Sequence, residues 1–116
     1  MPISTAGKNA MLDYLGTVAV YASLHSGDPG DNGANELSGG SPAYARKAIT
    51  WNAASAANLD NNANPVFDVA AGSTVAYVGL WSAVSSGTFY GSAAVTSEAF
   101  AGQGTYTVSD ADVALS

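Results

Sequence analysis

Acidic and amide side chains crowd the stretch that follows the single histidine, His25, and precedes Arg46. Oxygen donors of this kind can bind calcium, and paired carboxylates can perform acid–base catalysis. The same side chains also hydrogen-bond nearby backbone N–H groups, which holds an irregular loop in one shape. The residues concerned are Asp28, Asp31, Asn32, Asn35 and Glu36.

The spacing of these residues favours a structural role. It matches no EF-hand, and a polar loop leaves its carboxylates ionised, so the separated pKa values that an acid–base pair needs are not expected. We predict that residues 27–41, called the lobe below, are ordered without metal. A calcium site in the lobe stays open as the alternative.

Nucleophilic catalysis would depend entirely on His25, because the chain has one histidine and no cysteine. No Gly-x-Ser-x-Gly motif surrounds any serine, and a hydrogen-bonded histidine at the end of a strand is commoner than a catalytic one. We therefore expect neither enzyme activity nor a cofactor. Arg46 can place its guanidinium fork on a carboxylate such as Glu36 or Asp28, and the alternative is a solvated charge.

Composition limits the classes of partner. A chain of 116 residues predicts one domain, residues 1–116. Three basic and nine acidic residues give a net charge of −6, which argues against binding to nucleic acid. No apolar run is long enough for a membrane span, and no signal peptide is expected. Only 10% of the residues are charged, and such a surface packs readily against other proteins.

Alternating apolar and polar residues predict an antiparallel β-sandwich of the Greek-key or jelly-roll kind, with one short N-terminal helix. Ser4 and Thr5 can cap this helix, which runs to Leu15 with Gly16 as its stop, and it should cover one end of the core. The strands are expected at 17–26, 44–51, 65–70, 74–83, 88–95 and 103–109, with further short strands possible at 56–59 and 113–115.

The run 74–83 is predicted to be the central strand, since both of its side-chain rows can be buried. Trp81, Leu80 and Val78 should therefore lie near the centre of the packing. Gly91 indicates a bulge in the strand that follows.

Three blocks of the sequence resemble a recurring pattern in small tailed-bacteriophage virion proteins. They read Leu-His-Ser-Gly-Asp-Pro-Gly from Leu24, Asn-Glu-Leu-Ser-Gly-Gly from Asn35, and Tyr-Ala-Arg-Lys-Ala-Ile-Thr-Trp from Tyr44. The resemblance continues in Gly-Leu-Trp at 79–81 and Gly-Thr-Phe at 87–89. Proteins of this kind are labelled head-decoration, minor tail or tail-fibre-like.

The resemblance implies a structural virion protein that is made in the host cytoplasm. We expect a decoration protein on the lattice of the major capsid protein, assembled as a homo-oligomer with a trimer favoured. The alternative is a tail, tail-tip or minor tail protein that contacts a receptor or carbohydrate. A small hydrolase or metal-dependent lectin is the third hypothesis, weakened because no aromatic residue lies between His25 and Tyr44.

Overall fold

The computed structural model describes residues 1–115 and begins with one helix, α1, Thr5–Val18. The Ser4 hydroxyl caps it by accepting a hydrogen bond from the Gly7 N–H (3.1 Å). The predicted stop at Gly16 is wrong, because the helix continues to Val18. A Cβ at Gly16 would lie 3.4 Å from the Trp51 ring, so this glycine allows close packing of the helix instead of ending it.

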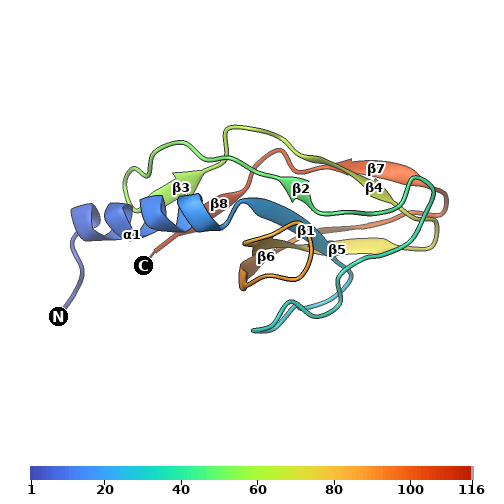
Figure 1. Cartoon of the computed structure of the whole chain (residues 1–116), viewed down its shortest axis with the longest axis horizontal. Coiled ribbons are helices and arrows are strands. Elements are labelled where there is room, and N and C mark those ends of the chain that lie inside the picture. The colour runs from blue at the N-terminus through green and yellow to red at the C-terminus, as the bar shows by residue number, and fades with distance from the viewer. Residues whose placement is uncertain (116) are drawn as a thin grey trace.

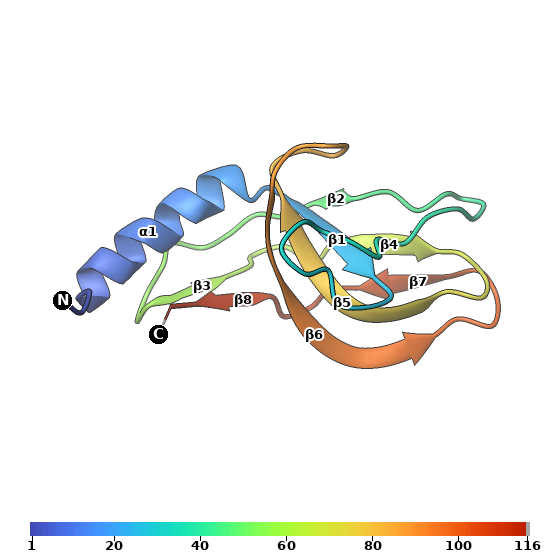
Figure 2. The ribbon, with the colours of Figure 1, turned by 90° about the horizontal axis from the view of Figure 1, so that it is seen from below.

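Eight strands follow the helix, and all of their pairings are antiparallel. Four of them form a sheet in the order β2-β1-β5-β6, and the other four form two ribbons, β3-β8 and β4-β7 (Figures 1 and 2). The strands are β1 Tyr21–His25, β2 Lys47–Ala48, β3 Asn58–Asp60, β4 Val66–Val69, β5 Thr74–Trp81, β6 Phe89–Ala99, β7 Gly104–Thr107 and β8 Asp112–Ala114.

The second half of the chain pairs in a nested order. β5 pairs with β6, β4 with β7 outside them, and β3 with β8 outside both. A long hairpin that folds back on itself gives this order, which is the principle of a jelly roll.

The core lies between the four-stranded sheet and the β4-β7 ribbon. Phe67 and Val69 of β4 and Val108 after β7 pack against Ala22 and Leu24 of β1. The predicted fold class is therefore confirmed as a mainly antiparallel, sandwich-like β structure with one N-terminal helix. The rest of this buried cluster comprises Leu37, Ile49, Val75 and Val78.

Three predicted strands have clearly wrong boundaries. The first strand begins only at Tyr21, because the helix occupies residues up to Val18. The second shrinks from 44–51 to two residues, since the Trp51 indole N–H turns to the Ala19 carbonyl (2.9 Å) and the chain leaves β1 there. β6 extends four residues beyond the predicted 88–95, to Ala99, and its register with β5 shifts next to Gly91, where a bulge was predicted.

The three residues expected at the centre of the packing lie on both faces of β5. Val78 is buried in the core, and Leu80 is half-buried against it. Trp81 is also buried, at 8% exposure, but on the opposite face of the sheet, where the lobe covers it. The sheet is thus covered by the β4-β7 ribbon on one face and by the lobe on the other.

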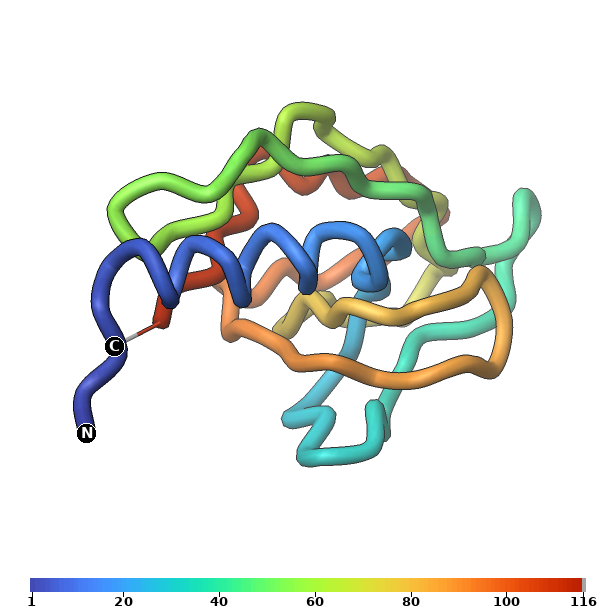
Figure 3. Tube along the Cα trace, turned by 60° about the vertical axis from the view of Figure 1, so that its left-hand side comes forward, coloured from blue at the N-terminus to red at the C-terminus, as the bar shows by residue number. Residues whose placement is uncertain are grey.

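The molecule is elongated, 48 × 26 × 25 Å, and α1 lies with the β3-β8 ribbon at one end (Figures 1 and 3). The helix contacts β3 and fully buries only Leu12. In residues 1–115, no helix combines the length and the apolar character that crossing a membrane requires.

Candidate functional site

The lobe consists of two turns. The first, residues 27–35, hangs from the four-stranded sheet (Figure 1) and touches it through Gly33, which lies directly against the Trp81 ring. A hydrogen bond from the Ser26 N–H to the Asn35 carbonyl (2.9 Å) closes this turn. The second turn lies around Ser41, whose N–H donates to the Gln103 side chain (3.2 Å).

Asp28 and Asn35 hold the first turn from within. The Asp28 carboxylate accepts from the Gly30 N–H (2.9 Å), and the Asn35 side chain donates to the Asp28 carbonyl (3.0 Å). Asp31 and Asn32 are exposed at the tip. Across residues 1–115, no three acidic or histidine side chains lie close enough together to hold a metal ion.

Arg46 and Glu36 form a bidentate ion pair that fastens the lobe. The Arg46 Nε and Nη2 donate to the two oxygens of Glu36, each at 2.9 Å. Nη1 donates to the carbonyls of Ala83 (3.1 Å) and Ser86 (2.7 Å), in the turn between β5 and β6. One guanidinium with a side chain only 8% exposed therefore joins the lobe to the β5-β6 turn.

Tyr44 adds a second support to Glu36. Its hydroxyl donates to the Glu36 carboxylate (2.7 Å) and accepts from the Leu24 N–H (3.0 Å), so the carboxylate is linked to the backbone of β1. Burial raises the pKa of Glu36, but the hydrogen bonds from Arg46 and Tyr44 outweigh burial and hold this pKa below its usual value. Burial also raises the pKa of the Tyr44 hydroxyl.

Ser23, His25 and Trp81 form a buried chain of hydrogen bonds. The Ser23 hydroxyl lies 2.7 Å from His25 Nε2 and accepts from the Trp81 indole N–H (2.9 Å). His25 Nδ1 lies 2.8 Å from the Ala34 carbonyl. Burial lowers the pKa of His25, so the neutral ring donates from Nδ1 and accepts from Ser23.

A serine beside a histidine is also the beginning of a nucleophilic triad, but this pair is closed to substrate. Ser23 and His25 are both 0% exposed, and the histidine's other nitrogen faces a backbone carbonyl instead of a carboxylate. Every buried side-chain nitrogen and oxygen within residues 1–115 has a hydrogen-bond partner. The arrangement therefore acts as an internal brace for the sheet and the lobe.

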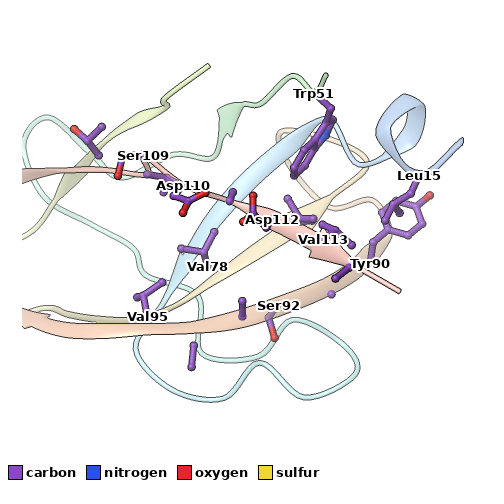
Figure 4. A pocket seen from close by; sticks show the side chains of 18 of the residues that line it. Leu15, Trp51, Val78, Tyr90, Ser92, Val95, Ser109, Asp110, Asp112 and Val113 are labelled. Carbon is purple, nitrogen blue, oxygen red and sulfur yellow. The ribbon is translucent and has the colours of Figure 1, made fainter. Parts of the chain in front are cut away.

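A groove with a volume of about 500 Å³ runs along the other side of the molecule, between β6 and the C-terminal segment 106–114 (Figure 4). Val78 and Val95 line its apolar part, and Asp110 and Asp112 bring two carboxylates to it. Asp112 lies opposite Asp60 in the β3-β8 register. The hydrogen bond between these two carboxyls, with the charge of nearby Asp110, raises the pKa of Asp112 to about 6.

Sequence reasoning singled out Glu36 and Arg46 but missed much of their surroundings. A serine two positions before a histidine on one strand puts both side chains on one face, so the Ser23–His25 contact had a local signal. The positions of Trp81 over Arg46 and of Asp112 opposite Asp60 had none, because they depend on pairings between distant strands.

The fold and these contacts define a small β-domain whose chemistry-bearing side chains in the lobe region are committed to one another. A family model described as podophage GP4 fiber I protein gp80 matches residues 2–115, and the chain belongs to this family. No curated protein and no solved structure matched the chain.

Family membership confirms the predicted relation to bacteriophage virion proteins. It agrees better with the alternative prediction, a tail component, than with the preferred prediction of capsid decoration.

Proposed function

We propose that this protein is a structural part of a phage tail fibre that works by packing against other virion proteins, without catalysing a reaction. The single observation that carries the proposal is the family match over residues 2–115 to a fibre protein. The match covers nearly the whole chain, so the proposal applies to the domain as one unit.

The interior of the domain supports a mechanical role. Arg46 uses three nitrogens to join the lobe to the β5-β6 turn, and the hydrogen bonds of Ser23 and His25 are internal. Buried polar networks in which every group is satisfied rigidify a domain. A rigid domain suits a part that transmits or resists force within a larger assembly.

Copies of this chain are proposed to associate through α1. Met11 and Tyr14 lie three positions apart on the helix surface and are 45% and 69% exposed. Apolar side chains in such a position are typical of surfaces that another protein covers. Closed cyclic symmetry is the common outcome for identical subunits, and we favour a trimer.

Copy number tests the place of the protein. Densitometry of purified virions should give a few tens of copies or fewer, whereas a decoration protein approaches the number of major capsid subunits on a symmetric lattice. Gold-labelled antibody should locate the protein at the tail. Labelling spread evenly over the head would refute the fibre proposal and restore capsid decoration.

Light scattering tests the oligomer. A trimer should show three times the 11.5 kDa mass of one chain. Tyr14→Glu should lower this mass, and Val84→Glu, an exposed apolar position in the β5-β6 turn, is the matched control that should not. A monomeric wild-type protein, or equal effects of the two substitutions, would contradict association through α1.

A further inference from the structure

β6 is a long strand with a free edge. It is the last strand of the β2-β1-β5-β6 sheet and runs for eleven residues, from Phe89 to Ala99. Among residues 1–115 its strand partner is β5, on one side only. An edge of this kind presents a row of unpaired N–H and C=O groups to which another extended chain can bind.

The sequence of β6 does little to protect that edge. Natural edge strands are commonly blocked by lysine, proline or inward-pointing charges. β6 contains no lysine or proline, and its only charged residue, Glu98, is near its end. The stretch from Gly91 to Val95 therefore remains suited to pairing.

The groove follows this edge. Its lining includes consecutive residues on both sides, 90–95 of β6 and 106–114 of the C-terminal segment. Successive side chains of a strand point to opposite faces, so a wall of consecutive residues consists of the strand's edge. Figure 4 shows the two segments bordering the groove, with Val78 and Val95 between them.

The size and lining of the groove suit a narrow apolar segment. Its volume of about 500 Å³ lies within the usual range for binding sites. Ala93, Ala94 and Ala111 contribute small side chains, which leave room for a backbone to approach. Tyr90, 40% exposed, lies near the end beside α1.

The negative charge of the groove favours an occupant with positive charge. Asp110 and Asp112 line it, with Asp60 across the ribbon from Asp112, and no lysine or arginine is among the lining residues. A second copy of this chain carries a net charge of −6 and would meet this end with like charge. A basic segment would neutralise it and relieve the repulsion between the carboxylates.

We propose that the groove binds an extended segment of a different protein, with small apolar side chains and at least one lysine or arginine, which adds as a strand to the free edge of β6. Backbone hydrogen bonds to β6 hold the segment, its apolar side chains face Val78 and Val95, and its cation pairs with Asp110 and Asp112. Such strand addition draws affinity from the main chain and specificity from the side-chain pockets. The inference stands on the groove and does not need the fibre assignment.

The test uses the whole protein and a blocked synthetic peptide of alternating valine and alanine with lysine at both ends. Two control peptides are used. In the first, glutamate replaces the lysines. In the second, alternate backbone nitrogens are methylated, which removes donors for strand pairing. Calorimetry should give a dissociation constant of about 0.1–1 mM for the lysine peptide and at least about tenfold weaker binding for both controls. Amide chemical shifts should change at residues 90–95 and 106–114.

Substitutions on the protein complete the test. The double change of Asp110→Asn and Asp112→Asn should weaken the lysine peptide about tenfold and reduce its salt dependence, because both side chains are exposed and the fold stays intact. Asp31→Asn, at the tip of the lobe, is the matched control and should leave binding unchanged.

Three outcomes would overturn the proposal. One is the absence of saturable binding at about 1 mM lysine peptide, and another is equal binding of the glutamate peptide. The third is concentration-dependent shifts of the same groove amides without peptide, which would assign the groove to a second copy of this chain.

Discussion

The guanidinium carbon of Arg46 lies 3.6 Å from the centre of the Trp81 ring, so the cation is stacked on the aromatic face. The same guanidinium donates hydrogen bonds to both oxygens of Glu36 and to the carbonyls of the β5-β6 turn. A cation that contacts both a ring and a carboxylate is desolvated and paired, so its interactions are far stronger than those of a surface charge. Residues far apart in sequence thereby become one unit.

Replacement of Arg46 should therefore be costly. Arg46→Ala leaves the partly buried Glu36 unpaired and should lower the free energy of unfolding by about 3 kcal/mol, and Arg46→Lys, which keeps the charge but loses the fork, by about half as much. Guanidinium denaturation measures both. Lys47→Ala on the neighbouring position should change stability by about 0.5 kcal/mol or less, and a similar loss in both alanine variants would show that the ion pair is unimportant.

Gly33 should tolerate no side chain. A Cβ there would overlap the Trp81 ring, and the backbone has a φ of +80°. Gly30 has a similar φ of +62° but open space around it, so Gly30→Ala measures the cost of the backbone conformation alone. We expect Gly33→Ala to cost about 2–3 kcal/mol more than Gly30→Ala, which should cost about 1 kcal/mol. Equal denaturation midpoints would mean that the first turn does not rest on Trp81.

His25 should titrate below its ordinary pKa of 6.5, because burial disfavours its charged form. The unfolded chain then binds the proton more readily, so this contribution to stability is present above about pH 6.5 and is lost as the pH falls towards the lowered pKa. As the chain has one histidine, its ring protons give one readily assigned NMR titration. An apparent pKa of 6.5 or higher would contradict the buried neutral ring.

The shifted pKa of Asp112 should make stability depend on pH in the opposite direction from that of His25. The carboxyl of Asp60 raises its pKa to about 6, so its contribution is present below the ordinary carboxyl pKa of 3.8 and is lost as the pH rises through about 6. Asp112→Asn should therefore gain stability relative to the wild type as the pH is raised from about 4 to about 7. Asp31→Asn serves as control. Parallel pH profiles for the wild type and Asp112→Asn would rule out the interaction between the carboxyls.

The lobe should keep its structure without calcium. Asp28, Asn35 and Glu36 are occupied by hydrogen bonds within the protein, so a chelator should leave the rate of proteolysis between residues 27 and 41 unchanged. Arg46→Ala should increase that rate, which provides the positive control. If chelator alone accelerated cleavage, the calcium alternative would replace this explanation.

The sequence predicted the features that depend on local pattern. The alternation at 74–83 located β5, and the charges of Glu36 and Arg46, ten positions apart, suggested their pairing. It did not predict that Lys47–Ala48 is all that remains of the second strand, because the Trp51 indole is drawn to a carbonyl at the end of α1. The groove could not be predicted either, because Asp112 and Val95 come to line the same groove only through the nested pairing order.

The first turn of the lobe is clamped at its base and unconstrained at its tip. Glu36 and Gly33 are fixed against Arg46 and Trp81, whereas Asp31 is exposed and Gly30 has open space around it. Residues inserted at the tip would add little to the cost of loop closure, about 0.6 kcal/mol for each doubling of loop length. The same molecule thus combines a fixed base of the lobe with a tip that has room for additional residues. A lineage that carries this fold can diversify its outermost surface while its interior stays the same.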